Sequence, residues 1–69
     1  MVLEHLEMAE RHVREGDEHI ALQEQRIAKL RLLGGDTAAA EALLKTMHHS
    51  QVLHVEGREL IRQELEQAE

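Results

Sequence analysis

The sequence predicts an all-α fold, an antiparallel two-helix hairpin that dimerises into a four-helix bundle. Apolar residues recur with a seven-residue period on both sides of one strong break, the glycine pair Gly34-Gly35. Proline is absent, so no other position interrupts the periodic segments as strongly. The 69 residues allow one small domain. We expect it to span residues 1–69, with a first helix over about 2–33, a loop over 34–36 and a second helix over about 36–67.

The first helix is predicted by a heptad repeat of the kind that forms a coiled-coil seam. One heptad position holds Leu6, Val13, Ile20 and Ile27, and the complementary position holds Val2, Ala9, Gly16, Gln23 and Leu30. Glutamates placed four residues before arginines support the same helix from its solvated side. We therefore expect this stripe to face the second helix.

The break between the helices has the residues that end one helix and start another. Gly34 can adopt the left-handed conformation that terminates a helix. Asp36 or Thr37 can accept hydrogen bonds from the free amides at the start of the next helix. The break therefore predicts a tight reversal of the chain.

The second helix begins in an alanine-rich stretch of high helix propensity and carries a wide stripe. The stripe consists of three rows: Ala40, Met47, His54, Ile61 and Ala68; Leu44, Gln51, Arg58 and Leu65; and Leu43, Leu53 and Leu60. One neighbouring helix cannot cover a stripe of this width, so a twofold dimer is the simplest closure. Val52 and Val55, which lie off the main stripe, leave a larger helical assembly as the alternative.

Polar residues and glycines interrupt both stripes at matching heights. We call this set the polar belt: His12, Gly16, His19 and Gln23 on the first helix, and Gln51, His54, Gly57 and Arg58 on the second. If residue n faces residue 70 − n, the belt pairs are Gly16 with His54, His12 with Arg58, and His19 with Gln51. Since glycine inside a helix costs about 1 kcal/mol relative to alanine, the two glycines indicate that room is needed there, either for close approach of the two backbones or for the imidazole and guanidinium groups opposite.

The polar belt has three interpretations. It is a hydrogen-bonded layer that fixes register and oligomer number, a partly hydrated layer without a specific role, or a ligand pocket. Arg58 with protonated His12 or His54 would favour a small anion such as a carboxylate or phosphate. If His12 and His54 are buried and neutral, mild acidification should loosen the dimer. The candidate ligand-binding residues are His12, His19, Gln23, Gln51, His54 and Arg58.

The histidine spacing does not predict a metal site within either helix. His5, His12 and His19 are seven residues apart, about 10.5 Å along a helix, which is too far for a shared ion. No histidine has a glutamate three residues before it, the spacing of helical di-iron sites. A site between the helices from His12, His19 and His54 stays open. We assign no resident metal or cofactor from the sequence.

An enzymatic role has little support from the residues. Cysteine is absent, so thiol catalysis and thiolate zinc sites are excluded. Ser50 is the only serine, and neither an oxyanion hole nor a glycine-rich phosphate loop is recognisable. We predict that the protein is not an enzyme.

The composition disfavours nucleic acid and membrane as partners. Fourteen acidic against eight basic residues give a formal charge of −6, and Phe, Tyr and Trp are all absent. Nucleic-acid binders present basic patches and often aromatic stacking platforms. The chain shows no apolar run of membrane-spanning length and no signal-peptide pattern at its start. We therefore expect a cytoplasmic protein.

Several short motifs spread over most of the chain carry a resemblance. They are His12-Val13 with Gly16, His19-Ile20 with Gln23, Gly34 with Asp36-Thr37, and Ala40 with Leu43-Leu44. In these motifs the chain resembles a group of short, uncharacterised bacterial helical-hairpin proteins. The shared pattern includes residues of the polar belt as well as of the apolar stripes. The resemblance implies no activity, cofactor or ligand residue.

These observations favour a small oligomerising module with a structural or regulatory role, an adaptor that dimerises and binds a helical protein partner. The alternative is a helical bundle that binds a small anion or a metal through the polar belt.

Overall fold

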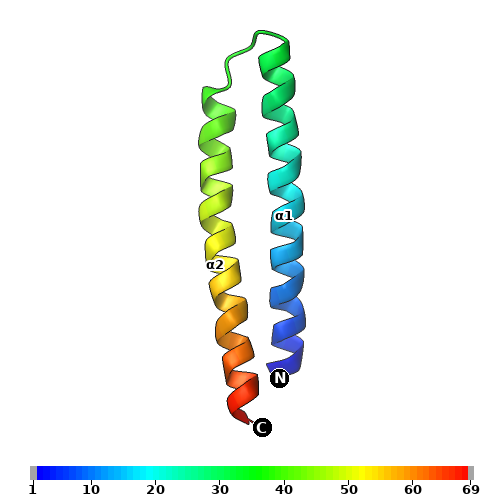
Figure 1. The fold of residues 1–69 in the computed structure, drawn as a ribbon, viewed down its shortest axis with the longest axis vertical. Helices are drawn as coiled ribbons and strands as arrows, with labels where there is room; N and C mark the ends of the chain where they lie inside the picture. Colours follow the sequence, from blue (N-terminus) through cyan, green and yellow to red (C-terminus); the bar gives the residue numbers. More distant parts are fainter. Residues whose placement is uncertain (1, 69) are drawn as a thin grey trace.

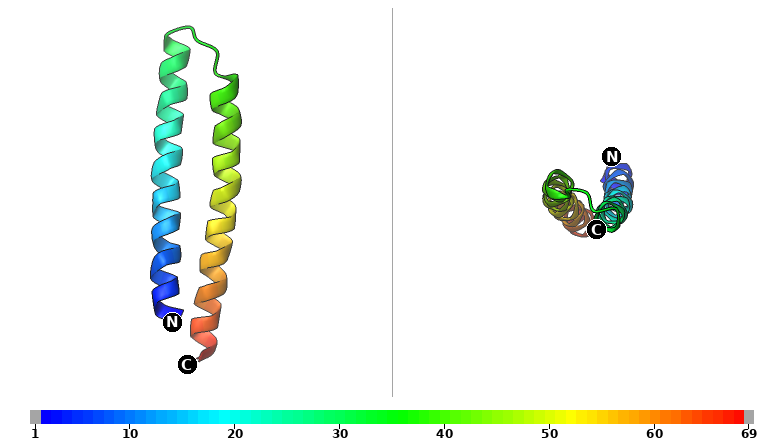
Figure 2. Two further views of the ribbon diagram at one scale, coloured as in Figure 1. Left: turned by 180° about the vertical axis from the view of Figure 1, so that it is seen from behind. Right: turned by 90° about the horizontal axis from the view of Figure 1, so that it is seen from above.

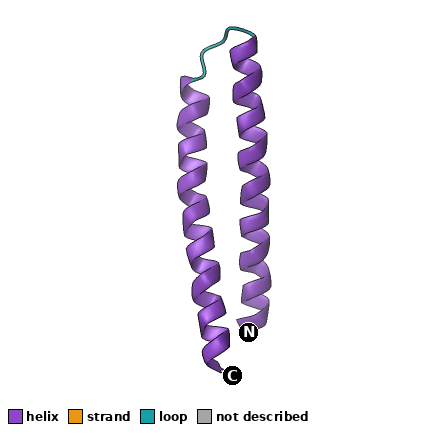
Figure 3. Cartoon of the chain, viewed as in Figure 1, coloured by secondary structure: helices purple, strands orange, loops and turns teal. Residues whose placement is uncertain are grey.

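The computed structural model describes residues 2–68 and consists of two long helices joined by a short loop (Figure 1). Helix α1 spans Val2–Leu32 and helix α2 spans Ala38–Ala68. They lie antiparallel along a rod of 55 × 14 × 13 Å, and the described residues contain no strand (Figure 3). The all-α hairpin is therefore confirmed. Helix α1 ends one residue earlier than expected, and α2 begins two residues later.

The loop forms because a left-handed glycine stops α1. Gly34 has φ of 74°, and its amide donates to the Arg31 carbonyl at 3.0 Å. The amide of Gly35 donates to the Leu30 carbonyl at 2.9 Å, which satisfies another carbonyl at the helix end. These bonds close the last turn of α1.

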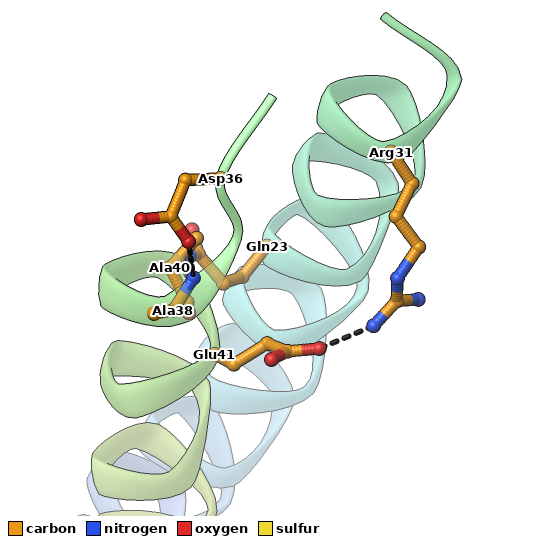
Figure 4. Close-up of polar contacts among 6 residues, drawn as sticks. All are labelled: Gln23, Arg31, Asp36, Ala38, Ala40 and Glu41. Carbon is orange, nitrogen blue, oxygen red and sulfur yellow. Dashed lines mark hydrogen bonds and ion pairs between the residues drawn. The ribbon is translucent and has the colours of Figure 1, made fainter. Parts of the chain in front are cut away.

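Asp36 starts α2. Its Oδ1 accepts a hydrogen bond from the Ala38 amide at 3.0 Å (Figure 4). The Thr37 carbonyl accepts the first helical bond, from the Glu41 amide. Beside this cap, Arg31 pairs with Glu41 across the two helices. Of the two capping residues that the sequence offers, Asp36 therefore uses its side chain.

Removing this cap should lower stability measurably. Asp36→Ala is expected to reduce the free energy of unfolding by about 1 kcal/mol, because one amide at the start of α2 loses its partner. Thr37→Ala is the matched control, and it should have a smaller effect since it leaves the bond to Asp36 in place. Urea unfolding at equal protein concentration measures both. An equal loss for the two variants would contradict the assignment.

The path of the loop sets the register of the hairpin. Two opposite views show α2 beginning below the end of α1, and the C-terminus extending past the N-terminus (Figures 1 and 2). The loop thus runs back alongside α1 before α2 starts. Gly16 consequently lies against Gln51 instead of His54, a shift of three residues or about one helical turn. The expected pairing of residue n with residue 70 − n is wrong.

The core between the helices is small. Its buried apolar residues are Val13, Ile20 and Ile27, all from the predicted stripe of α1. Two amides, Gln23 and Gln51, are buried beside them. Helix α2 contributes only partly covered apolar side chains, among them Leu44, Met47, Ile61 and Leu65. One hairpin therefore leaves much of the wide stripe uncovered.

Candidate functional site: a histidine-lined groove between the helices

The centre of the site is Gln51, a buried side chain of α2 that fits against Gly16. Its Nε2 donates to the Val13 carbonyl at 2.7 Å and to Asp17 Oδ1 at 2.9 Å. A Cβ atom at position 16 would lie 1.9 Å from Gln51 Oε1, so only glycine leaves space for the amide. The room predicted at Gly16 is real, but an amide occupies it instead of an imidazole.

Gln51 also orients His54. The Oε1 atom of Gln51 lies 3.1 Å from Nδ1 of His54. Because Nε2 of Gln51 already donates to two oxygen atoms, the amide orientation is determined and Oε1 can only accept. Nδ1 of His54 therefore carries the hydrogen, and its Nε2 has an exposed lone pair.

His12 is the nearest histidine to His54. Their ring centres are 5.8 Å apart, with an angle of 43° between the ring planes. The sequence predicted that His12 faces Arg58. Because the register of the two helices is shifted, His12 lies beside His54 instead. The two imidazoles come from different helices and form a pair that neither helix could make alone.

A groove that contains this pair runs along one side of the hairpin. His12, Glu15, Gly16, His19 and His54 line one part of it, and the adjoining part adds Thr46, Met47 and Ser50. The side of the hairpin that carries these residues is called the groove face below. His19 thus lies in the same groove as His12 and His54.

The histidines of the groove are exposed. His12, His19 and His54 all present much of their surface to solvent. In the single hairpin His12 and His54 are not buried, because the groove lies beside the seam. The expected loosening of a dimer by acid depends on their burial between two copies and stays a prediction.

The other candidate residues lie outside the groove. Gln23 is buried nearer the loop, where its Nε2 donates to the Ala40 carbonyl at 3.0 Å and Arg26 approaches its Oε1 at 3.5 Å. Its amide thus holds the two helices together. A Cβ atom at Gly57 would meet no atom within 4 Å in the hairpin, so the single chain makes no use of the room at that glycine.

Arg58 is partly buried in α2. Its Nε lies 3.4 Å from Glu59 Oε1, close enough for an ion pair. The direction is unsuitable for a hydrogen bond, however, and this buried Nε has no hydrogen-bond partner among the described residues. An unsuitable angle removes most of the energy of such a contact, so Glu59 holds this guanidinium weakly. Arg58 does not line the groove that contains His12 and His54.

Two acidic residues also belong to the site. Asp17 accepts from Gln51, and Glu15 lines the groove beside His12 and His19, the second of which it precedes by four residues. Asp17 looks like an ordinary surface residue in the heptad pattern, and only the register of the two helices reveals its role. Over residues 2–68, no group of three or more His, Asp or Glu side chains could hold a metal ion within one chain.

Comparisons with other proteins define no class for this chain. No family model matches it, and neither curated proteins nor solved structures give a significant match. Within residues 2–68, neither helix combines the length and apolar character needed to cross a membrane.

Proposed function

We propose that the chain is a small oligomerising module with a structural or regulatory role, an adaptor that pairs with a second copy and meets a helical protein partner. Pairing occurs through the groove face and gives a four-helix bundle. The observation that supports this proposal is the concentration of exposed leucines on that face.

Most of the exposed apolar residues belong to the groove face, because they share heptad positions with residues that line the groove. Residues seven apart lie on the same side of a helix. In the first helix, Met8 and Leu22 share the heptad position of the groove residue Glu15, and Leu33 shares that of His12 and His19. In the second helix, Leu53 and Leu60 share the heptad position of Thr46, and Leu43 shares that of Ser50. Leu53 is 55% exposed and Leu60 is 63% exposed. A face this apolar favours association.

The opposite face carries ion pairs, beside a hollow lined in part by Val52 and Val55. Arg31 pairs with Glu41, and Arg62 lies 3.7 Å from Glu10 and 3.1 Å from Glu59. Each exposed pair contributes little stability. Their position nevertheless marks this face as the solvated side. The two faces therefore differ in the way that the inner and outer faces of a bundle differ.

A second copy fits the groove face better than an unrelated surface for two reasons. Within residues 2–68 the hairpin buries three apolar side chains, Val13, Ile20 and Ile27, and so has little core, and chains of this size gain stability by oligomerising. A twofold contact also places the same apolar face on both sides of the interface. The wide stripe is then buried without a second kind of chain.

Polar substitution on the groove face tests the proposal. The triple variant Leu43→Gln, Leu53→Gln, Leu60→Gln should raise the dimer dissociation constant at least about 100-fold, because each leucine loses a buried environment in both copies. Sedimentation equilibrium over a range of chain concentrations measures this. The wild type should have twice the chain mass.

The matched control places glutamines on exposed apolar positions elsewhere. Leu32→Gln with Val52→Gln alters side chains that are 88% and 53% exposed but do not share the aligned heptad positions. This double variant should dimerise as the wild type does. A monomeric wild type, or equal weakening by both sets, would contradict the use of the groove face.

A further inference from the structure

We propose that the dimer binds one zinc-like divalent metal ion through His12 and His54 of both copies. This inference rests on the proposed pairing of groove faces, because a single chain supplies only two of the four ligands. The residues concerned lie in the groove described above.

The separation of the two imidazoles suits a shared metal ion. Zinc–nitrogen bonds of about 2.1 Å place the ring centres of two histidines on a tetrahedral ion on the order of 5 Å apart. The ring centres of His12 and His54 are 5.8 Å apart. Both side chains are exposed, so a small rotation closes the difference without disturbing the core. The pair is thus half of a metal site.

His54 also has the outer support that metal-binding histidines usually have. A ligating imidazole commonly donates its second ring N–H to an oxygen acceptor, which fixes its tautomer and orientation. Here Nδ1 of His54 faces Oε1 of Gln51 at 3.1 Å. Gln51 is itself held by the Val13 carbonyl and by Asp17. The free Nε2 of His54 is therefore available to a metal.

The heights of the apolar residues along the helix axes indicate how a second copy supplies the other two histidine ligands. Met8 and Leu60 lie about 6 Å and 9 Å beyond the His12–His54 level toward the open end, at 1.5 Å per residue. Leu22 and Leu43 lie about 15 Å and 16 Å from it toward the loop. Met8 and Leu22 of α1 thus each have an apolar counterpart on α2 at nearly the same height.

A twofold axis parallel to the helices brings equal heights of the two copies together. It stacks α1 of one copy on α2 of the other, so Met8 meets Leu60 and Leu22 meets Leu43 of the second copy. Between these apolar layers, two pairs of His12 and His54 converge on the axis. Four imidazole nitrogens in a tetrahedral arrangement form a closed zinc site.

The chemistry of the surroundings agrees with a bound cation. The chain has a formal charge of −6, so two copies attract positive ions. No three-ligand group exists within the described part of one chain, as expected for a site that only a second copy completes. Coordination requires neutral imidazole, so protons compete with the metal. Zinc should therefore bind less tightly as the pH falls.

The test is a titration of tag-free chain with zinc chloride at pH 7.5, followed by calorimetry and sedimentation equilibrium. We expect one zinc per two chains and a dimer dissociation constant at least tenfold lower with zinc. His12→Ala and His54→Ala should each abolish zinc binding while circular dichroism shows an unchanged helix content. His19→Ala, which alters a groove histidine at another level, and the double variant His48→Ala, His49→Ala should bind zinc normally.

The outcomes separate this inference from the proposed function. A wild type that dimerises but does not bind zinc overturns the metal site and leaves the pairing intact. Loss of binding in His19→Ala, or one zinc per chain, overturns the four-histidine arrangement. A chain that stays monomeric with and without zinc overturns both proposals.

Discussion

Replacing Ile27 with alanine should lower the free energy of unfolding by about 2–4 kcal/mol. Ile27 is 5% exposed and is one of three apolar side chains that are buried among residues 2–68. Ile27 packs in the seam between two rigid helices, so its truncation leaves a cavity that the helices cannot close by repacking. The loss is a large part of the stability that so small a core provides. Thermal or urea unfolding at one fixed chain concentration measures it, since association also shifts the midpoint.

The control for this deletion removes the same volume from the surface. Leu32 lies at the end of α1 and is 88% exposed. Leu32→Ala should change the free energy of unfolding by no more than about 0.5 kcal/mol. A loss below about 1 kcal/mol for Ile27→Ala would show that the seam between α1 and α2 contributes little to stability.

The two helices and their contact stripe could be predicted from the sequence because both depend on local information. The heptad that contains Val13, Ile20 and Ile27 predicts the buried side of α1, and these are the residues that the structure buries. The glycine pair and Asp36 predict the reversal between the helices for the same reason, since turn and cap geometry depend on neighbouring residues.

The register between the helices could not be predicted in the same way. It depends on the three-dimensional path of five loop residues, and a change of one helical turn leaves every heptad position on its own side of the helix. The periodic pattern is therefore compatible with Gly16 facing either His54 or Gln51. The close fit of the Gln51 amide against Gly16 selects the second arrangement.

The heptad pattern did not predict the exposure of the belt histidines, because it does not distinguish the middle of a wide stripe from its flank. In a single hairpin, each helix has one neighbour, which covers the middle of the stripe and leaves its flank open. Gln51 lies in the middle and is buried, whereas His54, three residues further along α2, lies on the flank. A second copy would cover that flank, so the burial of these histidines remains a prediction for the dimer.

Gly16→Ala is expected to lower the free energy of unfolding by about 1–3 kcal/mol, although alanine has the higher helix propensity. The new Cβ would lie 1.9 Å from Oε1 and 2.7 Å from Cδ of Gln51. Gln51 would have to leave its position and give up its buried hydrogen bonds to the Val13 carbonyl and Asp17. That loss and the strain of overpacking exceed the propensity gain of about 1 kcal/mol.

Two further variants test whether the close fit of Gln51 against Gly16 causes the loss of stability in Gly16→Ala. Gly57→Ala meets open space in the hairpin and should raise stability by up to about 1 kcal/mol. Gln51→Ala made together with Gly16→Ala removes the clashing amide, so the double variant should be more stable than the sum of the single changes predicts. Calorimetric unfolding of the four variants at one chain concentration measures the coupling. Stabilisation by Gly16→Ala, or strict additivity with Gln51→Ala, would mean that the amide does not occupy the space above Gly16, and the orientation inferred for His54 would lose its support.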